Sequence, residues 1–261
     1  MSAKITSINY CPVKSVSFQS VENCKIKKNI GIIGDRNFAF AKDLDLEQAK
    51  LFEKSPAERK GKWNKVLTLK NSPALNKYNF IFKDEKLTLT FKDNEILSID
   101  INQLTERETL SNKISELESS LKQPITLMKN DAFPFFDTSI SKKVDFVNSV
   151  SLLNFQSIND FEKKVGKKIE TSIFRGNICI DGLEPWKERE WIGKTIKINN
   201  ISFKVEKNIP RCVAINLKPK TDDNSFNLLQ LLKKNYNHFD MGIYLTALDD
   251  GEINIGNKIE L

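Results

Sequence analysis

Short alternations of apolar and polar residues run along most of the chain and predict a protein built largely of β-strands. Three alternating runs, at residues 78–82, 87–91 and 96–101, are separated by charged turns and predict a meander. Hairpins are predicted around Asn199-Asn200 and around Asp249-Asp250-Gly251, the second joining strands 241–248 and 253–261. The remaining predicted strands span residues 5–10, 21–26, 36–40, 65–70, 125–128, 174–180 and 213–217.

Apolar residues at spacings of three and four predict a few helices among these strands. The clearest spans Thr105 to Leu121, where Thr105 and Glu108 also have the spacing of a capping box. Two more helices are predicted within residues 148–165 and 226–236, and residues 43–59 are predicted to form a loop or a short helix. This pattern predicts an α+β protein dominated by antiparallel β-structure, with an N-terminal β-barrel-like lobe over residues 1–121 and a second lobe over residues 122–261.

Composition and charge narrow the class of ligand. The formal net charge of +7, from 41 basic and 34 acidic residues, favours anionic ligands or an acidic partner. A lysine-rich solvated surface explains this charge better than a nucleic-acid footprint, because no nucleic-acid-binding signature is present. No apolar run approaches the roughly 20 residues that span a bilayer, and the N-terminus lacks a signal-peptide core, so we expect a cytoplasmic protein without a membrane segment.

The cysteines and the histidine limit the metal chemistry. Cys11, Cys24, Cys179 and Cys212 form no Cys-x-x-Cys pair, which argues against a zinc or iron–sulfur site within the chain and predicts free thiols. The single histidine, His238, is interpreted as a partly exposed residue at a helix end.

Four short stretches are candidates for one anion-binding site beside a thiol. They are Lys14-Ser15 in the first turn, Arg36 after a Gly-x-x-Gly-Asp run, Arg175 with Asn177, and Arg211-Cys212. Each has a simpler explanation, because a cysteine is often a small buried residue, a turn lysine is usually solvated, and arginines pair with carboxylates or cap loops. Together they offer charge-assisted donors to a phosphate, and an arginine next to Cys212 favours the thiolate that binds a soft metal.

The order of several motifs carries a family resemblance over nearly the whole chain. The matching stretches are Tyr10-Cys11-Pro12-Val13-Lys14-Ser15, Gly34-Asp35-Arg36, Phe174-Arg175-Gly176-Asn177-Ile178, Asp181 to Trp186, Trp191 to Gly193, Arg211-Cys212 and Gly251 to Asn257. In this order they resemble the MOSC superfamily of molybdenum-cofactor proteins, in the branch that includes the mitochondrial amidoxime-reducing component and its bacterial relatives. The resemblance implies an N-terminal MOSC β-barrel domain at residues 1–121 and a MOSC domain, a β-barrel with flanking helices, at residues 122–261.

The resemblance also implies roles for the candidate residues. Cys212 would be the catalytic residue and the thiolate ligand of molybdenum. Cofactor binding would fall to Lys14, Ser15, Arg36, Asn148, Ser149, Arg175, Asn177 and Arg211. Two departures from the family pattern stand out: Gly176 occupies a position that is often proline, and the cofactor-contacting turn at residues 147–149 is degraded.

The implied activity is the reduction of N-hydroxylated small molecules by the molybdenum cofactor (Mo-molybdopterin). A separate electron-transfer protein carrying flavin, haem or an iron–sulfur cluster would supply the electrons. Binding of pyridoxal phosphate is a further family-level association, and no nucleic-acid partner is expected. Two alternatives stay open at this point: a non-catalytic carrier of the cofactor or of sulfur, and a β-rich interaction protein with a basic surface.

Overall fold

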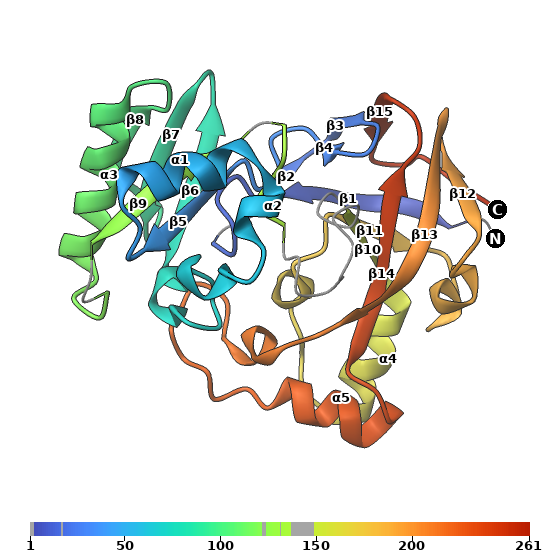
Figure 1. Cartoon of the computed structure of the whole chain (residues 1–261). Coiled ribbons are helices and arrows are strands. Elements are labelled where there is room, and N and C mark those ends of the chain that lie inside the picture. Colours follow the sequence, from blue (N-terminus) through green and yellow to red (C-terminus); the bar gives the residue numbers. More distant parts are fainter. Residues whose placement is uncertain (1–2, 17, 122–123, 131, 137–148) are drawn as a thin grey trace.

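A large sheet formed by strands from both ends of the chain dominates the computed structural model, which describes residues 3–16, 18–121, 124–130, 132–136 and 149–261 (Figure 1). In spatial order its strands are β16 (Ile259–Glu260), β12 (Thr195–Ile198), β13 (Ile201–Pro210), β14 (Asp240–Ala247), β10 (Val150–Asn154), β11 (Ile178–Asp181), β1 (Lys4–Tyr10) and β2 (Gln19–Val21). Neighbours are antiparallel except β10 and β11, and the sheet curls into a half-barrel. Its concave core includes the fully buried Ile8, Leu152, Phe203 and Leu245.

A small three-stranded sheet completes this core. It consists of β15 (Gly251–Asn254), β3 (Asn23–Lys27) and β4 (Gly31–Ile32), and it contributes Ile26, Ile32 and Ile253 to the same apolar cluster. The predicted closing hairpin is therefore wrong, because β15 pairs with β3 rather than with β14. The turn carboxylates explain the difference: Asp250 accepts a hydrogen bond from the Lys28 amide at 2.6 Å, and Asp249 accepts one from the Ser202 amide at 2.9 Å.

The second part of the molecule is formed by most of the first 130 residues. Strand β5 (Phe38–Lys42) pairs with β9 (Ile125–Lys129), and the predicted meander is confirmed as β6 (Tyr78–Lys83), β7 (Lys86–Phe91) and β8 (Asn94–Asp100). Helices α1 (Leu46–Lys54), α2 (Pro56–Arg59) and α3 (Leu104–Leu117) lie in this part (Figure 1). Phe40, Phe80, Leu89 and Leu110 form its core, which is separate from that of the large sheet.

The predicted helix at 105–121 exists, but its predicted capping box is wrong. Helix α3 begins one residue earlier, and its N-cap residue Gln103 makes no side-chain capping bond. The carboxylate of Glu106 in the first turn instead accepts a hydrogen bond from the Asp100 amide at 2.6 Å, which ties the helix to the end of β8. Because an acidic side chain in the first turn complements the helix dipole, this contact also stabilises the helix N-terminus.

Two helices cover the outer face of the large sheet, as the apolar spacing predicts. They are α4 (Phe155–Val165) and α5 (Leu228–Tyr236), and both pack on a cluster that includes Leu153, Phe161, Phe174 and Leu232. Figure 1 shows them side by side beneath β14. His238 follows α5, where burial and the positive charge of Arg189 lower the pKa of its imidazole.

Short 3-10 helices replace two predicted strands. Val66 forms only an isolated bridge with Ala41 after η1 (Trp63–Lys65), and residues 213–217 contain η7 (Val213–Asn216) instead of an extended segment. The others are η2 (Pro73–Lys77), η5 (Thr171–Phe174) and η6 (Lys187–Trp191). The predicted α+β class with mostly antiparallel sheets is confirmed. Among the described residues, no helix combines the length and apolar character needed to cross a bilayer.

Candidate functional site

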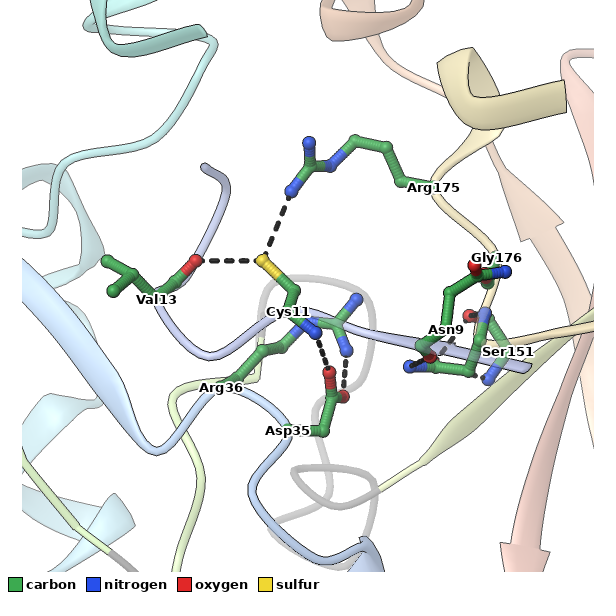
Figure 2. Close-up of polar contacts among 9 residues, drawn as sticks. Asn9, Cys11, Val13, Asp35, Arg36, Ser151, Arg175 and Gly176 are labelled. Carbon is green, nitrogen blue, oxygen red and sulfur yellow. Dashed lines mark hydrogen bonds and ion pairs between the residues drawn. The ribbon is translucent and has the colours of Figure 1, made fainter. Parts of the chain in front are cut away.

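The thiol of Cys11 lies at the centre of a buried group of charged side chains (Figure 2). Cys11 follows the last residue of β1, and Pro12 prevents the strand from continuing its ladder. The Cys11 amide donates to Asp35 Oδ1 at 2.8 Å, and its Sγ donates to the Val13 carbonyl at 2.8 Å. These bonds fix the turn at the end of β1 and leave the sulfur facing the arginines described next.

Arg36 and Arg175 approach Cys11 from opposite sides (Figure 2). Arg175 Nη1 donates to the Val16 carbonyl at 2.8 Å, and its Nη2 donates to Cys11 Sγ at 3.4 Å. Arg36 forms an ion pair with Asp35. Both arginines have left-handed backbone conformations, with φ of 55° and 51° respectively, a region that residues other than glycine seldom adopt.

The charges in this group do not cancel among the described residues. Burial lowers the pKa of the Arg175 guanidinium, and the positive charge of Arg36 lowers it further. Burial also acts to lower the pKa of Arg36, but the negative charge of Asp35 outweighs it and the pKa is raised. Burial raises the pKa of the Cys11 thiol, which therefore stays protonated and neutral. Two guanidiniums with one carboxylate leave an excess positive charge that suits an anionic ligand.

Arg211 connects Cys212 to the segment that carries Arg175. Its Nε donates to the Met241 carbonyl at 2.9 Å, its Nη2 bonds to the same oxygen, and its Nη1 donates to the Phe174 carbonyl at 2.7 Å. Burial lowers the pKa of this guanidinium to about 10, against the opposing effect of Tyr244. Because Phe174 directly precedes Arg175, Arg211 holds the end of β13 against the Arg175 segment.

Cys212 is exposed at the corner between β13 and η7, with an extended backbone at φ −121°. The alternative that it is a packed, buried cysteine is therefore excluded. Its neighbour Val213 is also exposed, so the sulfur lies at an accessible edge of the protein. An exposed thiol next to a firmly held arginine is available to bind a metal or to react.

The remaining residues predicted to bind the cofactor, Lys14, Ser15, Ser149 and Asn148, do not share one environment. Lys14 is buried rather than solvated, its amide donates to the Phe38 carbonyl at 2.7 Å, and its ammonium lies 5.4 Å from the centre of the Trp63 ring. Ser15 follows it with a left-handed backbone, φ 62°. Ser149 is buried, and Asn148 lies outside the described residues.

Asn177 is fully buried and holds three strands together. Its Oδ1 accepts from the Ser151 hydroxyl at 2.7 Å and the Ser151 amide at 3.1 Å, while its Nδ2 donates to the Asn9 carbonyl at 3.1 Å. These bonds join the start of β11 to β10 and β1. The Asn177 side chain therefore supports the position of the adjacent Arg175.

A cavity of about 410 Å³ lies beside these residues, where the two parts of the molecule meet. Arg175 and Ala214 form part of its wall, so it borders both the Cys11 group and the segment after Cys212. Asn76 links the two parts, because its Nδ2 donates to the Lys218 carbonyl at 2.9 Å and the Thr221 carbonyl at 2.6 Å. The structure thus brings Arg36 and Arg175 together at Cys11, and Arg211 ties the segment that ends in Cys212 to the residue before Arg175.

Sequence reasoning missed the roles of Cys11 and Asp35. Both residues stand inside the motifs that carried the family resemblance, directly before Pro12 and Arg36. The available signal was their adjacency to these motif residues. The sequence nevertheless contains nothing that places Cys11 between two arginines whose positions lie 139 residues apart, at 36 and 175.

Comparison with known proteins finds a family match in the C-terminal part. Residues 143–260 match the family model of the MOSC domain, which agrees with the resemblance seen in the sequence. MOSC domains are associated with binding of the molybdenum cofactor.

Individual relatives match more weakly. Over 92 residues the chain is 27% identical to mitochondrial amidoxime reducing component 2 of Bos taurus, covering 35% of this chain and 27% of that protein. The chain thus spans about a quarter of the length of this curated relative. Among solved structures, YuaD from Bacillus subtilis aligns with a TM-score of 0.45 and 12% identity over 100% of this chain and 95% of that chain. YiiM from Geobacillus stearothermophilus aligns with a TM-score of 0.35 and 15% identity over 43% of this chain and 53% of that chain.

Proposed function

We propose that the protein is a molybdenum-cofactor-dependent reductase of N-hydroxylated compounds, such as hydroxylamines and amidoximes, that receives electrons from a separate redox protein. The observation that carries this proposal is the exposed thiol of Cys212, held by Arg211 against the segment of Arg175. The match to the family model of the MOSC domain and the partial similarity to an amidoxime reducing component support it.

The residues present fit such a cofactor. The excess positive charge of Arg36 and Arg175 over Asp35 suits the phosphate of a pterin, because buried guanidiniums bind phosphate through strong charge-assisted bonds. Cys212 offers an exposed sulfur ligand, and a thiolate is the donor that a soft metal prefers.

Each candidate site residue has a role in this proposal. Cys212 binds the metal, and Arg36, Arg175, Lys14 and Ser15 hold the organic part of the cofactor. Arg211 and Asn177 add to the cofactor site by fixing the Arg175 segment, while Ser149 and Asn148 stay predicted contacts. When bound, the cofactor supplies the two-electron chemistry that cleaves the N–O bond.

The overall reaction consumes two electrons and two protons and converts the N–OH compound into the amine or amidine and water. The electrons would come from the separate flavin, haem or iron–sulfur protein. The cavity lined by Arg175 and Ala214 gives a small molecule access to the site.

Metal analysis of matched cysteine variants tests the proposal. We expect the wild type to retain molybdenum and to reduce benzamidoxime with an artificial electron donor. Cys212→Ser should lose both properties, whereas Cys24→Ser should keep them because Cys24 lies on β3 and has no assigned part in holding the cofactor. Molybdenum-loaded protein without turnover would overturn the reductase activity. A persulfide on Cys212 without molybdenum would instead establish the carrier alternative.

A further inference from the structure

Arg59, the last residue of α2, is a fully buried arginine to which the proposed function assigns no role. Its guanidinium bonds to two backbone carbonyls: Nε donates to the Phe52 carbonyl at 2.7 Å, and Nη1 donates to the Pro134 carbonyl at 3.0 Å. Within the described residues, its Nη2 has no hydrogen-bond partner. Burial lowers the pKa of this guanidinium to about 10. A charge buried with incomplete bonding costs free energy that an apolar side chain of similar size does not.

The guanidinium of Arg59 fixes one end of the segment formed by residues 134–136. Its Cζ lies 4.0 Å from the centre of the Phe135 ring, in addition to the bond that Nη1 makes with the Pro134 carbonyl. The bond to the Phe52 carbonyl ties the same guanidinium to the last turn of α1. Because the planar fork of an arginine can donate hydrogen bonds and stack on a ring at once, this single side chain joins the segment to α1.

The same segment supports Arg36 in its left-handed conformation. The Phe135 amide donates to the Arg36 carbonyl at 2.8 Å, and the centre of the Phe136 ring lies 5.0 Å from Arg36 Cζ. On the other side, the Arg36 amide donates to the Cys11 carbonyl at 2.6 Å. A residue with a Cβ keeps a left-handed backbone only where its surroundings impose it. The bond from Phe135 is therefore one of the two backbone bonds that keep Arg36 in place.

The far end of the segment is fixed by the second part of the molecule. Phe136 packs with Ile209 of β13 and Tyr244 of β14, and the centres of the Phe136 and Tyr244 rings are 5.5 Å apart. Loss of Arg59 would thus release one end of the segment and leave the other end anchored. We therefore expect the fold to survive this loss while Arg36 loses part of its support.

We propose that Arg59 is a positioning residue that holds Arg36 in its anion-binding conformation through residues 134–136. Arg59 acts through the Pro134 carbonyl and the Phe135 ring. An anion binds only those molecules in which Arg36 is correctly placed, so the apparent affinity falls in proportion to that fraction. The inference rests on the proposed function for the anion site of Arg36 and Arg175, and it requires neither molybdenum nor turnover.

Binding of inorganic phosphate to the full chain, prepared without cofactor, tests the proposal. By titration calorimetry at low salt, we expect the wild type to show saturable binding that Arg36→Gln abolishes. Arg59→Met, which cannot bond to either carbonyl, should weaken this binding about tenfold, and Arg59→Lys, which keeps a donor but not the flat fork, about threefold. Ile114→Val is the matched control, because it alters a fully buried residue of α3 and should lower Tm without changing phosphate affinity.

Unchanged phosphate affinity in both Arg59 variants would show that this residue only supports the fold, and it would overturn the proposal. If Arg59→Met does not fold, Arg59→Lys decides alone, and an unchanged affinity of that variant would have the same meaning. The proposal is also wrong if the wild type shows no saturable binding or if Arg36→Gln leaves the binding intact, because Arg36 would then hold no anion. Absence of molybdenum from the wild type would overturn the proposed reductase alone, since phosphate binding is measured without the metal.

Discussion

The thiol of Cys24 shows how burial of one residue makes stability depend on pH. Cys24 lies on β3, where burial raises the pKa of its thiol to about 12 and the negative charges of Asp35 and Glu252 add to the effect. In the unfolded chain a cysteine has a pKa of about 8.5. Between these values the unfolded state releases the proton and the folded state retains it. The free energy of unfolding therefore falls as the pH rises through this window.

Cys24→Ala should reduce this pH dependence. One proton difference corresponds to a slope of about 1.4 kcal/mol per pH unit, so the free energy of unfolding of the variant should fall less steeply by up to this amount above pH 9. Urea unfolding at pH 7, 8, 9 and 10 under reducing conditions measures both slopes. The two curves should run parallel below pH 8, and parallel curves up to pH 10 would contradict the prediction.

At the residue scale, the sequence put Arg36 and Arg175 among the candidates but did not predict what each one contacts. Arg36, Arg175 and Cys212 were recognisable because their motifs are short and local. The bonds of Arg211 were not predictable, since its guanidinium binds the carbonyls of Phe174 and Met241, at distant positions in the chain. Asn177 likewise reads as a ligand in sequence, whereas its buried amide joins β10 to β1.

At the element scale, one glycine allows two central strands of the large sheet to approach each other. Gly242 on β14 has φ of +81°, and a Cβ there would lie 2.4 Å from the Leu152 carbonyl oxygen on β10. Gly193 has the same φ of +81°, but a Cβ there would meet no atom within 4 Å. This pair separates the cost of backbone conformation from the cost of a steric clash.

Gly242→Ala should therefore destabilise the protein much more than Gly193→Ala. The Gly193 variant should lose about 1–2 kcal/mol, the usual cost of a left-handed conformation for a residue with a Cβ. The Gly242 variant carries the same cost and must also displace backbone in a paired strand, so a loss of more than about 3 kcal/mol is expected. Chemical denaturation measures both values, and equal losses would show that β10 moves aside freely.

Local patterns predicted the elements whose partners are close in sequence. The meander of β6, β7 and β8, the hairpin of β12 and β13, and the helices α3, α4 and α5 all appear where apolar periodicity places them. The closing hairpin failed because Asp249 and Asp250 bond to segments far from the turn. The strand predicted after Cys212 is wrong because residues 213–216 form a 3-10 helix. Alternation over so short a run does not distinguish a strand from a 3-10 helix.

At the scale of the whole molecule, strand pairing crosses the predicted boundary between residues 121 and 122. Strands β1 and β2 lie in the large sheet, and β3 pairs with β15, although all three precede the boundary. In the other direction, β9 pairs with β5. The site depends on this crossing, because Cys11 and Arg36 come from the first part of the chain and Arg175 from the second.

Residues 122–261 expressed alone should therefore fail to fold cooperatively. Without β1, strand β11 loses one of its two neighbours and becomes an edge strand, and without Ile8, Ile26 and Ile32 the core of the large sheet is open to water. The same fragment preceded by residues 1–36 through a flexible linker restores these strands and should recover a cooperative transition. Thermal unfolding followed by near-ultraviolet circular dichroism compares the two. A cooperative transition in the shorter fragment would contradict this prediction, because it would mean that the C-terminal part forms its core without β1. The C-terminal part would then fold first, and Cys11 and Arg36 would join Arg175 only afterwards.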